Sequence, residues 1–339
     1  MTKRLSVGLF ALAAAAGVSS CESINDYEGD CDPHYYVQFV FEKNMLSADA
    51  FASQVNSVNL YIFDAATGAF VKEYAEADET VLRQPGYRMA VDLPAGKRYE
   101  FVAWCGLAKN EGVFTVPQHV ANRSELSCTM ARTPIGRAGA TAFQDANLND
   151  YAHALFHGRE TALMPDSEGE HVVTVYLTKD TNNFNISLHH YGETLNPDDF
   201  IVTITDDNGR MDYTNALRAD EMIEYRPWSK PRYGEFDTNS GSQESGYMIS
   251  EIATARLLTD HEMRLSIVEK ASGETIFSMP VIRWAREFRS EKYASMDDQE
   301  FLDRQDEYAL TVFLTGGERW TAVEIVINGW HVMVDDIVM

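Results

Sequence analysis

The chain has 339 residues, of which 45% are hydrophobic, and its 28 basic and 52 acidic residues give a formal net charge of −24 at pH 7. This charge argues against a protein that binds nucleic acid or anionic lipid through a basic surface, so we expect no nucleic-acid partner. The length is typical of two domains of about 150 residues each, and the hydrophobic content is sufficient for a core in each.

The first 21 residues have the layout of a bacterial lipoprotein signal. Two basic residues are followed by an uncharged, alanine-rich run over residues 5–17, and then by Val18-Ser19-Ser20-Cys21. Small residues before a cleavage position are typical of secretory signals, and the apolar run is shorter than the ~20 residues needed to span a bilayer. We therefore predict a lipoprotein signal peptide over residues 1–20 and lipid attachment at Cys21. The alternative is a secreted protein with a coincidental cysteine.

The first half of the mature chain is predicted to be mostly β. Residues 21–30 are polar and acidic and predict a flexible tether between the lipid and the fold. After them, aromatic and β-branched residues in alternating patterns indicate strands at 35–41, 58–63, 69–74, 87–93, 99–104 and 172–177. The turn at 64–68 predicts a hairpin over 58–74. The stretch 133–165 is less regular and is interpreted as a long connection with a short helix near 151–157.

The second half repeats this pattern. Strands are predicted at 183–188, 200–205, 210–213, 263–269, 275–279, 308–314 and 322–334, and one helix within 284–307. The segments 200–213 and 263–279 resemble the 58–74 hairpin, which indicates a weak structural duplication. Many short strands separated by turns predict an all-β fold of two tandem antiparallel β-sandwich domains with minor helical insertions. We place these domains at residues 31–179 and 180–339.

Three cysteines remain besides Cys21. An exported protein can form disulfides, but an odd number leaves at least one thiol over. Cys105 and Cys128 are the preferred candidate disulfide because both lie in strand-like segments, and the alternative is that they are buried free thiols. Cys31 is the third cysteine.

Motifs that carry chemistry are weak in this sequence. His153 and His157 have helical i, i+4 spacing, but the glutamate that zinc proteases place after the first histidine is replaced by alanine. The adjacent His189 and His190 would face opposite sides of a strand. Residues 206–209 (DDNG) have calcium-loop residue types without the loop's spacing, and a turn is the better interpretation. We therefore expect no metal, no cofactor and no enzymatic activity.

Several segments together are similar to one family. These are the lipobox, the acidic tether, Cys31-Asp32-Pro33, residues 58–64 with Gly68, residues 93–104 (LPAGKRYEFVAW) and residues 325–330 (IVINGW). This ordered set resembles the anchor lipoproteins of Bacteroidales fimbriae, the type V pili. The resemblance covers nearly the whole mature chain and implies transthyretin-like sandwiches.

The resemblance also implies a function. It implies a lipoprotein of the cell outer membrane, exposed at the surface, that anchors a fimbria and limits its length by β-strand contact with the shaft pilin. An incomplete sheet edge suits that contact, because it can accept a partner's strand. A carbohydrate-binding surface lipoprotein of β-sandwich type is the alternative, and it would need exposed aromatic residues; Trp228 is the tryptophan that we expect to be exposed.

Overall fold

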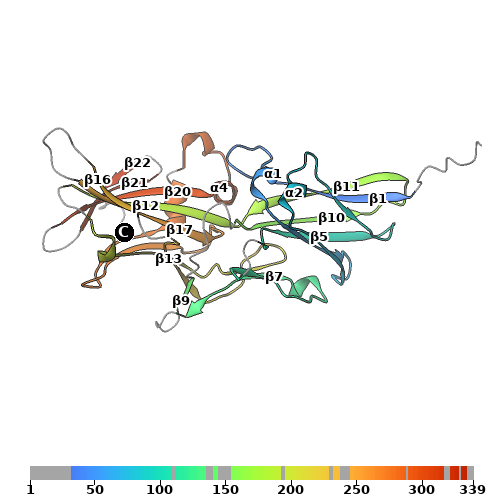
Figure 1. The fold of residues 1–339 in the computed structure, drawn as a ribbon, viewed down its shortest axis with the longest axis horizontal. Helices are drawn as coiled ribbons and strands as arrows, with labels where there is room; N and C mark the ends of the chain where they lie inside the picture. Colours follow the sequence, from blue (N-terminus) through green and yellow to red (C-terminus); the bar gives the residue numbers. More distant parts are fainter. Residues whose placement is uncertain are drawn as a thin grey trace, which may run out of the picture.

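The computed structural model describes residues 32–108, 112–134, 140–143, 154–191, 195–228, 232–236, 245–287, 289–316, 321–327 and 330–333. Its strands form two sandwiches that lie one after the other along the long axis of the molecule (Figure 1). The predicted fold class, all-β with tandem β-sandwiches and minor helices, is confirmed. The sheets are mainly antiparallel, with parallel pairs at β1–β11, β12–β20 and β9–β15.

The first sandwich is a single curled sheet of seven strands. In spatial order they are β3 (Phe70–Glu76), β2 (Val58–Asp64), β5 (Arg98–Cys105), β10 (Phe156–Leu163), β11 (Gly169–Lys179), β1 (Pro33–Val40) and β4 (Met89–Val91). Its two edges meet, because the Tyr74 hydroxyl on β3 accepts a hydrogen bond from the Asp92 amide after β4, at 2.7 Å. The short helices α1 (Phe51–Gln54) and α2 (Glu79–Leu82) lie in its connections.

Alternation of residue types explains which side of these strands is buried. On β1, Tyr35, Val37 and Phe39 point into the core of the first sandwich while their neighbours are partly exposed. Strand β5 is different, because seven of its eight residues are buried. Phe101 faces the interior of the first sandwich, whereas Trp104 belongs to a second core that extends into the other half of the chain. A strand covered on both faces reads as a continuous apolar run, as residues 101–105 do.

The second sandwich consists of two six-stranded sheets. One contains, in order, β16 (Arg232–Phe236), β17 (Ser245–Ala255), β12 (Thr181–Tyr191), β20 (Glu307–Thr315), β21 (Thr321–Ile327) and β22 (Trp330–Met333). The other contains β19 (Thr275–Pro280), β18 (Arg264–Glu269), β13 (Phe200–Asp206), β15 (Met222–Tyr225), β9 (Ala140–Phe143) and β8 (Thr133–Pro134). Helices α3 (Val281–Glu287) and α4 (Asp298–Arg304) and the 3₁₀ turns η2 (Pro197–Asp199) and η3 (Glu291–Tyr293) complete this half.

A small third sheet connects the two halves. It has the order β14 (Arg210–Asp212), β7 (Ser127–Met130) and β6 (Phe114–Thr115), and the 3₁₀ turn η1 (Arg123–Glu125) precedes β7. Strand β7 comes from the first half of the sequence and pairs with β14 from the second. Strand β9, also from the first half, pairs with β15. Strands β7 and β9 therefore pair with strands of the second half, and one hydrophobic cluster runs from Tyr61 to Ile327.

The predicted boundary between residues 179 and 180 falls where β11 ends and β12 begins. We keep the division into residues 31–179 and 180–339 as a proposal for the order of the two sandwiches along the chain. Sheet membership does not follow that division, because β7, β8 and β9 hydrogen-bond with strands of the second half or with each other.

Three local predictions are wrong. The stretch 133–165 is not the long connection with a short helix that was expected, because it contains strands β8, β9 and β10. Residues 156 and 157 belong to β10 instead of a helix, and residues 151–153 lie outside the described part of the chain. The predicted hairpin over 200–213 does not form, because β13 pairs with β15 and β18 while β14 pairs with β7. The single helix predicted within 284–307 is replaced by α3 and α4 with a 3₁₀ turn between them.

Candidate functional site at the junction and the sheet edges

The two ends of the molecule carry different strands. Strand β1 begins at the end remote from the second sandwich, while β16 and β22 lie at the opposite end (Figure 1). Cys21, the signal peptide over 1–20 and the tether over 21–30 lie outside the described residues, so lipid attachment at Cys21 stays a prediction. None of the helices in the described segments is long and apolar enough to cross a membrane.

Strand β22 forms an edge of its sheet. It pairs with β21 in antiparallel register, with Trp330 opposite Ile327 and Val332 opposite Ile325, and the described residues place no strand on its other side. Residues 330–333 of the predicted C-terminal strand therefore pair within their own sandwich, and residues 334–339 lie outside the described residues. An edge strand presents unpaired backbone groups and can accept a strand from another chain.

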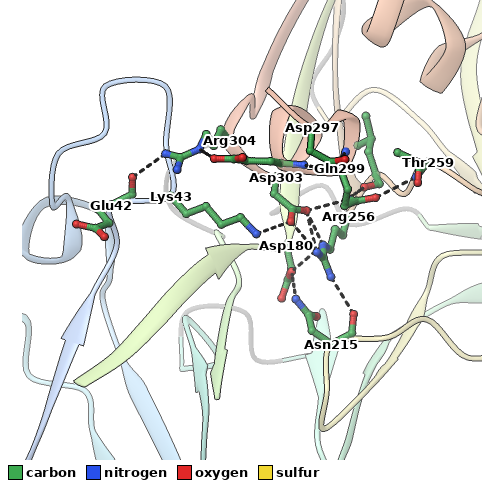
Figure 2. Close-up of polar contacts among 12 residues, drawn as sticks. Glu42, Lys43, Asp180, Asn215, Arg256, Thr259, Asp297, Gln299, Asp303 and Arg304 are labelled. Atoms are coloured by element: carbon green, nitrogen blue, oxygen red, sulfur yellow. Dashed lines mark hydrogen bonds and ion pairs between the residues drawn. The ribbon is translucent and has the colours of Figure 1, made fainter. Parts of the chain in front are cut away.

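A buried charged cluster holds the two sandwiches together at Asp303 (Figure 2). The Asp303 carboxylate accepts hydrogen bonds from Arg256 Nε at 2.9 Å and Nη2 at 2.8 Å, from Gln299 Nε2 at 2.9 Å and from Lys43 Nζ at 2.6 Å. Lys43 follows β1 of the first sandwich, whereas Arg256 follows β17 of the second. Because the Asp303 side chain is only 2% exposed, these donors compensate a charge that would otherwise be costly to bury.

Helix α4 is built to present Asp303 at this place. It begins at an N-cap, Asp297, whose carboxylate accepts the backbone N–H of Gln299 at 3.0 Å. At its other end, Arg304 Nη1 donates to the carbonyl oxygens of Glu42 at 3.1 Å and Asn44 at 3.2 Å. The helix therefore contacts the loop after β1 through a side chain on each of its last two positions (Figure 2).

Asp180 lies beside this cluster, between β11 and β12, and is completely buried. Its Oδ1 accepts a hydrogen bond from Asn215 Nδ2 at 2.8 Å and lies 3.8 Å from Arg256 Nε. Its Oδ2 has no hydrogen-bond partner among the described residues. Burial raises the pKa of Asp180 to about 7, and the Arg256 guanidinium opposes this rise only in part.

A second group of contacts surrounds Tyr213, which follows β14. The guanidinium groups of Arg123 and Arg159 lie over its ring at 5.7 and 5.8 Å and both pair with the buried Glu100 of β5. His157 Nε2 lies 3.0 Å from the Tyr213 carbonyl oxygen, and burial lowers the pKa of His157 to about 3. His157 is buried on β10 and its Nε2 is already engaged by a backbone carbonyl oxygen, which does not suit the zinc role considered for it with His153; His153 lies outside the described residues.

A groove of about 620 Å³ opens at the junction. It is lined by residues of both sandwiches and of α4, namely Glu42, Lys43, Tyr176, Leu177, Thr178, Asp297, Gln299, Glu300, Asp303 and Arg304. Two ion pairs lie in its lining, Lys43 with Asp303 and Arg304 with Glu300, and the first of them joins the two sandwiches.

The structure does not form the candidate disulfide between Cys105 and Cys128. Both are free, buried thiols. Cys105 packs in the core of the first sandwich and Cys128 in the core that extends into the second half, so β5 separates their surroundings. Burial raises the pKa of each thiol, as expected for inert core cysteines. Cys31 lies outside the described residues.

The histidine pair on β12 and the two aspartates at the end of β13 are the other candidates from the sequence. His189 and His190 face opposite sides of β12, as predicted: His190 Nε2 accepts the Gly316 N–H at 2.9 Å, whereas His189 packs on Phe313. Asp206 and Asp207 begin the predicted turn, but the structure brings His261 to them from 55 residues away. Burial raises the pKa of Asp206 to about 6. Sequence reasoning missed this group because no local motif connects His261 with the turn.

One family model matches nearly the whole chain. The family model described as "Fimbrillin-A associated anchor proteins Mfa1 and Mfa2" matches residues 27–336. No curated protein matches the chain.

Solved structures share the fold over nearly the whole chain. A candidate adhesin from Bacteroides thetaiotaomicron is 30% identical, with a TM-score of 0.74, over 90% of this chain and 98% of that chain. A candidate polysaccharide-binding protein from the same organism is 27% identical, with a TM-score of 0.71, over 89% of this chain and 98% of that one. The fimbrial anchor protein Mfa2 from Porphyromonas gingivalis is 14% identical, with a TM-score of 0.64, over 89% and 99%.

The family model covers all but the ends of the chain, and the tandem sandwiches are those expected from the resemblance. The chain belongs to the family of fimbrillin-A-associated anchor proteins Mfa1 and Mfa2.

Proposed function

We propose that the protein is a non-enzymatic outer-membrane lipoprotein that anchors a fimbria at the cell surface and limits its length. Its family gives it a fimbrial anchor or adhesin role. The observation that carries the finer proposal is the separation of the two ends: the chain enters the fold at β1, and the edge strand β22 lies at the far end of the second sandwich (Figure 1). A lipid at one end and a strand acceptor at the other suit a protein that links a membrane to a polymer.

The membrane side of this proposal depends on Cys21. The Val18-Ser19-Ser20-Cys21 sequence follows an apolar run and precedes an acidic segment of about ten residues. That segment is long enough to separate the first sandwich from the bilayer surface, since an extended residue spans ~3.3–3.6 Å. Several acyl chains on one cysteine would hold the protein stably, whereas one chain would not.

The fimbrial side depends on a sheet edge. We infer that the outer edge of β22 is where a strand of the first shaft pilin pairs, with backbone hydrogen bonds giving affinity. The buried charged cluster at Asp303 supports this arrangement mechanically, because it couples the second sandwich to the first at the point where a pulling force on the fimbria would be transmitted.

The edge contact can be tested with proline substitutions, which remove one backbone N–H each. Successive N–H groups of a strand point to opposite sides, so one of His331→Pro and Val332→Pro removes a donor that faces away from β21. We expect that variant to keep the wild-type thermal unfolding and to lose co-purification with pilin. Val71→Pro on β3, an edge strand of the first sandwich, is the matched control and should still capture pilin. Capture that survives both β22 substitutions would contradict the proposed edge.

A second candidate function rests on one groove. This groove, of about 450 Å³, lies on the second sandwich. Its lining includes Trp228 and the amide and carboxylate side chains of Asn183, Asn185, Gln305, Glu251 and Glu307. An aromatic ring beside amide and carboxylate groups suits a sugar, and one similar structure is named as a candidate polysaccharide-binding protein. A glycan array with wild type and Trp228→Ala tests this: binding that the variant loses would favour it, and absence of any glycan signal would remove it.

A further inference from the structure

Three metal-ligating side chains meet at one end of the second sandwich. Asp206 ends β13, Asp207 follows it, and His261 lies in the connection between β17 and β18. The Nδ1 atom of His261 lies 3.2 Å from Asp206 Oδ1 and 3.0 Å from Asp207 Oδ1. One ligand atom from each residue lies within 4.8 Å of the other two.

A second observation points to a missing ligand at this place. Asp206 is 2% exposed, and its Oδ1 also accepts the N–H of Asp207 at 2.9 Å. The other oxygen, Oδ2, is buried and has no hydrogen-bond partner in the described part of the chain. A buried carboxylate oxygen without a partner is costly, and a cation bound at this carboxylate would compensate that cost.

The surrounding side chains hold this group in place and do not compete for it. Asn208, which is completely buried, donates from Nδ2 to the Arg256 carbonyl oxygen at 2.9 Å and accepts the Tyr225 hydroxyl at Oδ1 at 2.5 Å. These bonds tie the turn after β13 to the segment that leads to His261.

The ligand set and its spacing select the class of ion. Two carboxylates and one imidazole suit zinc-class transition metals, whereas calcium and magnesium prefer oxygen ligands alone. Tetrahedral zinc with bonds of ~2.0–2.1 Å places its ligand atoms about 3.3 Å apart. The two separations from His261, 3.0 and 3.2 Å, are within a few tenths of an ångström of that spacing.

We propose that Asp206, Asp207 and His261 bind one zinc-class divalent cation, with water completing its coordination. The Asp207 side chain is 46% exposed and gives the ion access to solvent, while that of His261 is 17% exposed. The ion would fasten the turn after β13 to the β17–β18 connection, only a few residues from Arg256 of the charged cluster. This stiffens the second sandwich on the side that faces the first.

The test uses the mature chain after treatment with EDTA, titrated with ZnCl₂ in a calorimeter and, in parallel, with CoCl₂ while the visible spectrum is recorded. We expect one equivalent of Zn²⁺ to bind, a tetrahedral Co²⁺ spectrum, and a rise in the unfolding temperature with Zn²⁺ that CaCl₂ does not produce. His261→Ala and Asp207→Asn should each weaken Zn²⁺ binding by roughly tenfold or more. Asp260→Asn removes an exposed charge next to His261 and should leave binding unchanged.

Two results would overturn the proposal. One is the absence of binding at one equivalent of Zn²⁺. The other is equal binding by wild type, His261→Ala and Asp207→Asn, which would assign the ion to another place on an acidic surface. If His261→Ala unfolds without metal, Asp207→Asn decides the question, because its half-exposed side chain can be changed without loss of the fold.

Discussion

The substitution Asp303→Asn tests how strongly the charged cluster joins the two sandwiches. Asparagine keeps the shape of the side chain and one acceptor, but it places an NH₂ group among the donors Lys43 Nζ and Arg256 Nη2 and removes the charge that compensates them. Removing one partner of a buried ion pair costs ~3–5 kcal/mol, and we expect the lower value because one acceptor remains. For about 300 folded residues with an unfolding entropy of ~2.1 cal/mol/K per residue, about 3 kcal/mol lowers the unfolding temperature by roughly 5 °C.

Urea unfolding and calorimetry of the mature chain measure this effect. Because β7 and β9 pair across the halves, we expect one cooperative transition that moves as a whole. Lys43→Met, whose side chain is 34% exposed, should cost only about 1 kcal/mol. Asp260→Asn is the control for loss of one acidic charge and should leave stability unchanged within ~0.5 kcal/mol. A loss below about 1 kcal/mol for Asp303→Asn, or a shift confined to one of two separate transitions, would refute the reasoning.

Three further predictions concern stability. The pKa of buried His157 is lowered to about 3 from 6.5, so the unfolded chain binds more protons between these values and the free energy of unfolding falls as the pH falls below 6.5. Between pH 7 and about pH 5, His157→Gln should therefore lose about 2 kcal/mol less of its free energy of unfolding in urea than wild type does. Equal losses would exclude this role for His157. A Cβ at Gly106 would lie 2.1 Å from the Ala154 carbonyl oxygen, whereas one at Gly112, which also has positive φ, meets nothing within 4 Å. In thermal unfolding, Gly106→Ala should therefore cost ~1–3 kcal/mol more stability than Gly112→Ala. Similar costs for the two variants would show that the backbone moves to relieve the close approach. Deleting residues 331–339 removes most of β22 and should destabilise the protein by roughly 1–2 kcal/mol in calorimetry, since β21 loses its neighbour; unchanged stability together with fimbriae released into the medium would instead indicate that this strand is donated to the pilin.

Strands with strong alternation could be located from the sequence. The hairpin over 58–74 appears as β2 and β3, with Gly68 at φ 73° in its turn, and residues 172–177 and 308–314 lie within β11 and β20. These segments contain enough apolar residues with period two to indicate their buried face without knowledge of the partner strand.

The pairing between the halves could not be predicted in the same way. Strands β6 to β9 have two to four residues each, so they show no period. The second-half partners of β7 and β9, which are β14 and β15, follow about 80 residues later. Their position depends on the outer face of β5, where Trp104 needs a cover that the first sandwich does not provide. The hairpin predicted over 200–213 failed for the same reason, because β14 bonds to β7 and not to its neighbour in sequence.

The contacts of the charged cluster could not be predicted either, because they join residues that are far apart in the sequence. Lys43 and Asp303 are separated by 260 residues, and each alone reads as an ordinary surface charge in a chain with 52 acidic residues. Lipid attachment at Cys21 stays a prediction from a local and continuous signal, on residues outside the described part of the chain. The surroundings of Cys105 and Cys128 could not be predicted, since strand patterns give no information on which core a side chain enters.

The central claim, a lipid-anchored base for a fimbria, is tested most directly by the place and length of fimbriae on cells. Cells that lack the protein are complemented with wild type, with Cys21→Ala, or with Ser20→Ala, which keeps a small residue beside the modified cysteine. Pilin in cells and in medium is quantified, and fimbrial lengths are measured by electron microscopy. We predict that Cys21→Ala releases fimbriae that are longer than in wild type, while Ser20→Ala behaves as wild type. Fimbriae of normal length that stay on the Cys21→Ala cells would contradict the account.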